Sequence, residues 1–147
     1  MGMVSSQAQS SPVLADTSFL VALLNKREAR HLQCHQACQR INGPIVTCEA
    51  CVAETFHLLR HAGPAVIALL ANIREGAIEI PFRLRDSAAA VHKLMEKYSD
   101  TPCDFADACL IAMADQLNTG NILTLDSDFK HYRWRRNRSF RLLIPLE

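Results

Sequence analysis

Acidic side chains recur beside short apolar runs in this chain of 147 residues. The six that stand out are Asp16 after PVLA, Glu54 in VAETFHLL, Asp104 and Asp107 in DFADACLIAMA, and Asp126 and Asp128 around the end of ILTLDSD. Every residue from Phe105 to Ala114 except Asp107 is apolar, which is typical of a helix buried on most sides. Burying an unpaired carboxylate costs on the order of several kcal/mol, so Asp107 calls for a partner.

Plainer roles for some of these acids stay open. Asp104 directly precedes the apolar run and suits a helix cap, and the helix dipole would favour Asp107 in the first turn. Asp126 and Asp128 enclose one serine, and Asp-Ser-Asp is good turn chemistry. Capping accounts less well for Asp107, because a cap needs only one acid.

A suitable fold must bring these segments together. Short β-branched and aliphatic runs predict strands at PVLAD, IVT, AIEIPF, NILTL and FRLLIP, and the longer stretches between them predict helices. This alternation predicts an α/β fold, a three-layer sandwich with a central parallel sheet of four to five strands flanked by helices. Because open α/β sheets bind ligands beyond the carboxyl ends of their strands, Asp16 and Asp126 are expected at a ligand site.

The composition is that of one globular domain. Hydrophobic residues make up 49% of the chain, enough for a sizeable core, and the formal net charge is +1. We expect residues 1–11, rich in Ser and Gln, to form a flexible leader, and residues 12–147 to form the domain. The sequence has no long apolar run and no signal-peptide pattern, which predicts a cytoplasmic protein without a membrane segment.

One segment near the C-terminus is basic despite the low net charge. Between positions 130 and 141, six Lys or Arg residues alternate with aromatic residues in what we expect to be a loop. This mixture can pair with phosphates and stack on bases. We therefore predict nucleic-acid binding by Lys130, Arg133, Trp134, Arg135 and Arg136, although a solvated loop has a similar composition.

A second candidate metal site rests on His and Cys residues. His31, Cys34, His35 and Cys38 have helix-compatible spacing, and Cys48 and Cys51 form a C-x-x-C pair downstream. Together they do not follow the paired arrangement usual at zinc sites. We expect the six cysteines to be reduced and mainly structural, because cysteine often packs as a small apolar side chain.

Taken in order, the acidic motifs resemble those of the PIN-domain ribonucleases, with the VapC-type toxins and their stand-alone relatives as the nearest likeness. The resemblance extends over about residues 13–145 and rests on LADTSFLVALL, VAETFHLL, DFADACLIAMA and ILTLDSDF. Each motif alone is weak, whereas four in the family's order are fairly specific. By this resemblance Asp16 matches the acid after the first strand, Glu54 the helix glutamate, Asp107 the acid before the apolar helix, and Asp126 the acid of a Thr-x-Asp motif.

The resemblance implies a Rossmann-like nuclease that binds Mg²⁺ or Mn²⁺ and cleaves RNA. The implied catalytic residues are Asp16, Glu54, Asp107 and Asp126, with Asp16, Asp107 and Asp126 as metal ligands, Asp104 and Asp128 as accessory ligands, and Thr124 in support. Oxygen ligands suit these hard cations, which activate water and neutralise charge on a phosphodiester. The implied partners are an RNA substrate, an antitoxin protein and a second copy of the chain.

Other functions compete with this one. A catalytically silent PIN-like module would bind RNA or metal through the same acids without cleavage. A Mg²⁺-dependent phosphatase is disfavoured, because DTSFL after the first strand lacks D-x-D spacing. A nucleotide-binding protein is disfavoured too, because the sequence has no glycine-rich phosphate loop.

Overall fold

The computed structural model describes residues 10–146. Residues 1–9 of the leader predicted over residues 1–11 therefore lie outside the described residues. In chain order the elements are β1 (Val13–Ala15), α2 (Thr17–Leu24), α3 (His31–Gln39), β2 (Ile45–Val46), α4 (Glu49–Leu58), α5 (Gly63–Arg74), β3 (Ile78–Glu79), α6 (Leu84–Lys97), α7 (Phe105–Leu117), β4 (Asn121–Leu123), the 3₁₀ helix η2 (Ser127–Lys130), β5 (Arg133–Trp134), β6 (Arg138–Ser139) and β7 (Arg141–Leu142). None of the helices within residues 10–146 has the length and apolar character needed to cross a bilayer.

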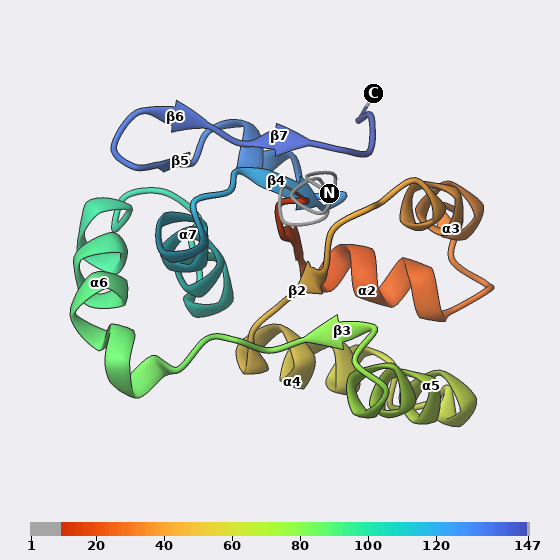
Figure 1. Cartoon of the computed structure of the whole chain (residues 1–147). Coiled ribbons are helices and arrows are strands. Elements are labelled where there is room, and N and C mark those ends of the chain that lie inside the picture. Colours follow the sequence, from red (N-terminus) through yellow and green to blue (C-terminus); the bar gives the residue numbers. More distant parts are fainter. Residues whose placement is uncertain (1–9, 147) are drawn as a thin grey trace, which may run out of the picture.

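Five short parallel strands form the central sheet in the order β3-β2-β1-β4-β7. The middle strand is β1, where Leu14 pairs with Val46 on one side and with Ile122 on the other. Helices α6 and α7 lie on one side of the sheet and α2 and α3 on the other, with α4 and α5 toward the β3 edge (Figure 1). The predicted three-layer α/β sandwich is confirmed.

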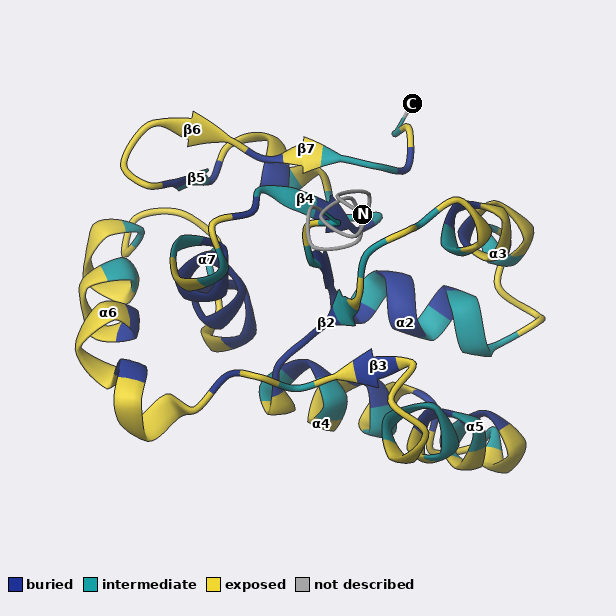
Figure 2. Ribbon diagram, viewed as in Figure 1, coloured by how far each residue is buried: buried dark blue, intermediate teal, exposed yellow. Residues whose placement is uncertain are grey.

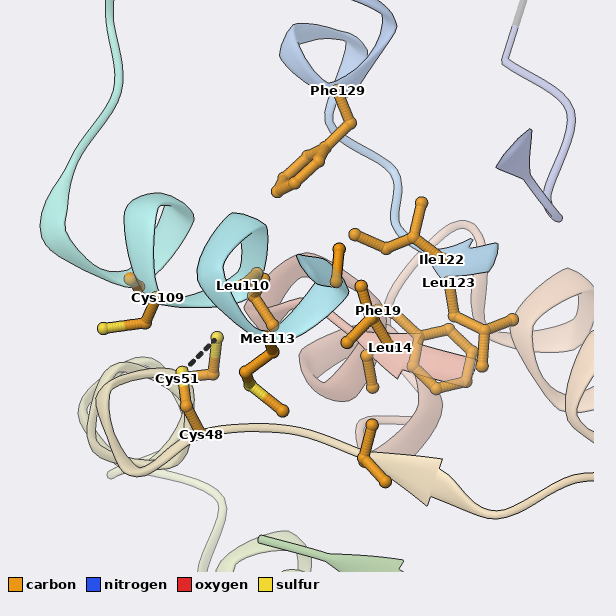
Figure 3. Packing of buried hydrophobic residues seen from close by; sticks show 14 of the residues in the cluster. Leu14, Phe19, Cys48, Cys51, Cys109, Leu110, Met113, Ile122, Leu123 and Phe129 are labelled. Carbon is orange, nitrogen blue, oxygen red and sulfur yellow. Dashed lines mark hydrogen bonds between the residues drawn. The ribbon is translucent and has the colours of Figure 1, made fainter. Parts of the chain in front are cut away.

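Helix α7 is the most deeply buried helix, as its apolar sequence predicts. All residues from Ala106 to Ala114 are buried, including Asp107, and most of the helix is dark blue in Figure 2. It packs against α6 and against α4. Leu110 and Met113 of α7 belong to the same hydrophobic cluster as Leu14 and Phe19 (Figure 3). Because α7 is anchored so firmly, the acids at its N-terminus occupy a fixed place.

Three cysteines meet where α4 packs against α7. The Sγ atoms of Cys48 and Cys51 are 3.6 Å apart, and the Cys109 thiol lies beside them (Figure 3). All three side chains are buried. Hydrogen bonding with Cys109, followed by burial, raises the pKa of the Cys48 thiol to about 12, so this thiol stays protonated at neutral pH. These contacts place the three thiols inside the core.

The basic segment forms a hairpin, which corrects the prediction of a loop. Strands β5 and β6 pair antiparallel, with Arg133 opposite Ser139. The turn between them holds Arg135 at a φ of 45° and Arg136 at a φ of 73°. The indole of Trp134 lies so close over Gly120 that a Cβ at position 120 would come within 2.2 Å of Nε1. This contact fastens the hairpin to the start of β4.

Candidate active site

Asp16 lies where the central strand β1 meets α2. Its Oδ1 accepts the Thr17 N–H at 2.8 Å and caps α2, while its Oδ2 accepts the hydroxyls of Thr124 at 2.7 Å and Ser18 at 3.2 Å. The side chain is only 5% exposed. Burial raises the pKa of Asp16 to about 6, and repulsion from Asp126 adds to this effect. Neutral donors therefore hold the carboxylate in place without neutralising it.

Thr124, just after β4, connects Asp16 to Asp126. Its Oγ1 donates to Asp16 and accepts the backbone N–H of Asp126 at 3.0 Å. Ser18 strengthens this link by accepting the Leu125 N–H at 2.9 Å. The carboxyl ends of β1 and β4 are neighbours in the sheet, so the two acids that follow them lie close together. The structure thus shows the contact to Asp16 that a supporting role of Thr124 requires.

Asp104 and Asp107 form a reciprocal capping box at the start of α7. Asp104 Oδ1 accepts the Asp107 N–H at 2.9 Å, and Asp107 Oδ2 accepts the Asp104 N–H at 3.2 Å. Asp104 is exposed, whereas Asp107 is buried. Burial, followed by repulsion from Asp104 and Asp16, raises the pKa of Asp107 to about 7. Asp104 and Asp107 therefore do cap α7, but capping alone does not explain why the Asp107 carboxylate is buried near Asp16.

Glu54 approaches the same place from the exposed face of α4. The buried Thr17 hydroxyl donates to Glu54 Oε1 at 2.7 Å. Thr17 directly follows Asp16, so the Glu54 carboxylate is held next to the strand-end acid. Helix α4 packs against both α2 and α7, the helices that follow Asp16 and carry Asp107. The fold therefore gathers acids from two helices, α4 and α7, and from two strand ends.

This set of oxygen donors suits a hard divalent cation. Within residues 10–146 the only ion pair joins His92 and Glu96 on α6, so no Lys or Arg in that range neutralises the buried acids. As the side chains lie, no three His, Cys, Asp or Glu residues of the described chain are close enough to enclose a metal ion. Mg²⁺ keeps several waters and usually takes only one or two carboxylates, so Asp16 and Asp107 with water fit its demands.

Comparisons with known proteins agree with this geometry. The family description "PIN domain" matches residues 13–135. The chain belongs to the PIN-domain family. Ribonuclease VapC26 of Mycobacterium tuberculosis is 28% identical over 116 residues, covering 78% of this chain and 86% of the relative. The crystal structure of VapC20 from the same organism, described as a sarcin-ricin loop cleaving toxin, matches 81% of this chain and 93% of its own with a TM-score of 0.74 and 24% identity. The resemblance inferred from the acidic motifs is confirmed.

Asp128 is the last of the candidate acids in chain order. Asp128 is half-buried in the first turn of η2, and its backbone N–H donates to Asp126 Oδ1 at 2.9 Å. The turn chemistry expected for Asp126 and Asp128 is therefore present. It orients one oxygen of Asp126, and the accessory metal role of Asp128 stays a prediction.

The predicted nucleic-acid-binding residues divide into two groups. Lys130, Arg135 and Arg136 are exposed, whereas Arg133 is half-buried and donates through its guanidinium to the carbonyls of Lys130 and Tyr132 at 3.0 and 2.9 Å. Trp134 is 7% exposed, and its Nε1 donates to Ser139 O at 3.2 Å. This burial contradicts the stacking of Trp134 on a base, because the large apolar ring joins the core instead.

Two residues of the site region escaped the sequence analysis. The phenol of Tyr132 reaches Asp107, a contact between positions that no local pattern connects. Phe105 is 44% exposed at the first position of α7, although it looked like part of the buried apolar run. No local pattern separates Phe105 from Ala106, Asp107 and Ala108, which follow it in the same turn and are buried.

Proposed function

We propose that this PIN-domain protein is a Mg²⁺- or Mn²⁺-dependent endoribonuclease of the VapC type. The observation that carries the proposal is the pair Asp16 and Asp107, two buried carboxylates whose pKa values are raised by burial and by neighbouring acids. A divalent cation would offset both effects. The similarity to Ribonuclease VapC26 supports RNA as the substrate.

The acids would divide the work between binding and chemistry. Asp16 and Asp107 would hold the cation together with water. A third ligand in Asp126, or accessory ligands in Asp104 and Asp128, would need a side-chain movement, because no three of these groups within residues 10–146 are close enough to enclose the ion. When bound, the cation supplies neutralisation of phosphodiester charge and a more acidic water. Thr124 and Ser18 keep Asp16 oriented through their hydroxyls. Glu54, held by Thr17 and open to solvent, would orient the attacking water and take up its proton.

Three exposed cations of the basic segment would bind the RNA backbone. Lys130, Arg135 and Arg136 lie on the segment that follows Asp126 and carry charge that phosphates can pair with. The Arg135 N–H donates to Asp115 near the C-terminal end of α7, so RNA bound by this turn would have to run along α7 to reach the acids at its N-terminal end. The antitoxin partner, the homodimer and the cytoplasmic location expected from the sequence remain predictions.

Incubation with labelled single-stranded RNA tests the proposal. Wild-type protein should cleave with Mn²⁺, stop when EDTA is added, and resume when Mn²⁺ is restored. Asp126→Asn should bind RNA but cleave it at least roughly 100-fold more slowly, since it removes a negative charge close to Asp16 at the proposed cation site. A wild type that binds RNA and never cleaves it with either cation would instead favour the catalytically silent module.

A further inference from the structure

Phe105 has an unusual position for a large aromatic residue in this fold. It is 44% exposed, and no other Phe, Tyr or Trp within residues 10–146 is as open to solvent. The aromatic residues of the basic segment, Tyr132, Trp134 and Phe140, are all buried. If an aromatic ring of this region contacts RNA, Phe105 is the ring that is free to do so.

The surface beside Phe105 is hollowed and borders the acidic site. A depression of about 320 Å³ is lined by Phe105 together with Ala50, Ala53, Glu54, Asp104 and Ala106. Two of these residues are acids of the candidate active site, and the three alanines give a smooth apolar wall. A smaller depression of about 100 Å³, reaching Phe82 and Leu84, also has Phe105 in its wall. The ring thus has open space beside it within reach of the acids.

The shape and chemistry of this depression suit a nucleobase. Bases stack on aromatic rings through their flat faces, and small neighbours such as alanine leave room for a second flat group. Glu54 also lines a second depression, with Ala53, His57 and Leu58, where the imidazole of His57 is the only ring. Phe105 offers the larger and wholly apolar ring for stacking beside Glu54.

We propose that Phe105 is a stacking platform for the base of a nucleotide next to the cleaved phosphodiester bond. The proposal rests on the proposed ribonuclease function and extends it to a base-binding subsite. Asp104, the residue before Phe105, is joined to Asp107 by the capping box, so the ring is rigidly connected to the acidic site. Because every base has a flat face, the subsite favours stacking over recognition of one base.

RNA binding in a cleavage-deficient background tests this subsite. In Asp126→Asn protein with Mn²⁺, a short single-stranded RNA carrying 2-aminopurine at one position at a time should show quenched fluorescence at one preferred position. Phe105→Ala should abolish that quenching and weaken affinity about ten-fold, the typical size of one lost stack. Phe105→Trp should keep both. Met95→Ala is the matched control, because Met95 is an exposed apolar residue at 37% on α6.

Two outcomes separate this proposal from the proposed function. If Asp126→Asn protein binds the RNA, and adding Phe105→Ala changes neither the affinity nor the quenching, the base subsite is wrong. The exposed ring would then be free to contact an apolar side chain of a protein partner. If wild-type protein neither binds nor cleaves RNA with Mn²⁺, the ribonuclease proposal itself fails and the subsite fails with it. Melting temperatures of the variants check that each one folds.

Discussion

The phenol oxygen of Tyr132 lies 3.1 Å from Oδ2 of Asp107 and joins the start of α7 to the segment that carries the arginines. The same hydroxyl also contacts the Pro102 carbonyl, so its single proton serves two acceptors. The rings of Tyr98 and Phe129 pack edge-on against Tyr132, with centroids 5.2 and 5.0 Å away. The orientation of a proposed metal ligand thus depends on a buried tyrosine.

Replacing Tyr132 by Phe should weaken Mn²⁺ binding roughly ten-fold, because groups that orient metal ligands typically contribute at least that much. Tyr98→Phe is the matched control: its hydroxyl accepts the Arg133 N–H at 3.0 Å, and its ring belongs to the same cluster. Mn²⁺ titration followed by melting temperature gives both affinities. Equal Mn²⁺ midpoints for the two variants would show that Tyr132 serves packing alone.

Asp107→Asn should lower both metal affinity and RNA cleavage sharply. The change removes one negative charge from a group of repelling acids, so the metal-free protein should be as stable as wild type or more stable. Its melting temperature should then rise less on addition of Mn²⁺. If Asp107 served only the α7 cap, the variant would lose roughly 1 kcal/mol or less and keep full cleavage with a normal Mn²⁺ response.

The metal-free protein should become less stable as the pH rises from about 4 to about 7. Asp16 and Asp107 have ordinary pKa values of 3.8, which the fold raises to about 6 and about 7. The folded state therefore holds these protons more tightly than the unfolded state, and its advantage disappears as they are lost. The free energy of unfolding should fall by on the order of a few kcal/mol over this range. Urea unfolding in EDTA measures it, and Asp107→Asn should reduce the slope.

Mn²⁺ should reverse that pH dependence. The cation competes with protons for the same carboxylates, so its stabilising effect should grow between about pH 5 and about pH 7.5. A Mn²⁺-induced shift in melting temperature that is the same at both pH values would speak against binding through Asp16 and Asp107.

Arg136→Gly should stabilise the protein while weakening RNA binding. At a φ of 73° an arginine is strained by roughly 1 kcal/mol relative to glycine, so glycine should raise the melting temperature. The same change removes a cation that we place on the RNA backbone, which should lower affinity and reduce its salt dependence. Arg136→Ala is the comparison, because it removes the charge and keeps the strain. Unchanged salt dependence in both variants would exclude Arg136 from the interface.

Serine at both Cys48 and Cys51 should lower stability and leave cleavage intact. Each hydroxyl would stand where a buried thiol now packs, at a cost of roughly 1–2 kcal/mol per site. Cys38→Ser, at a half-buried position on α3, should cost less. Unfolding by urea gives the stabilities. Stoichiometric zinc in purified protein, lost in the double variant, would contradict this structural role.

The sequence predicted those features that depend on local patterns. The parallel sheet and the acids at the ends of β1 and β4 follow from short apolar runs with an acid after each. The capping of α7 by Asp104 follows from an acid placed just before an apolar helix. The order of the acidic motifs led to the PIN-domain resemblance, which the family match over residues 13–135 confirms.

Features that depend on tertiary contacts could not be predicted in this way. The hairpin turn contains Arg135 and Arg136 with positive φ and none of the glycines that usually signal such a turn. Trp134 turns inward because Gly120 leaves room for its ring, which only the packed structure shows. Composition predicted that aromatic residues of the basic segment stack on bases. These rings are buried, so our proposal assigns base stacking to the exposed Phe105 instead.

The contact between Trp134 and Gly120 also affects the entropy of RNA binding. A free basic loop would lose many backbone conformations on meeting RNA, and that loss would weaken association. With the indole held over Gly120, the arginines next to it are ordered before RNA arrives. A side chain at position 120 would displace the Trp134 indole without touching the acids. The hairpin would then sample more conformations. Gly120, which has no side chain to touch RNA, thereby sets how rigid the basic surface is.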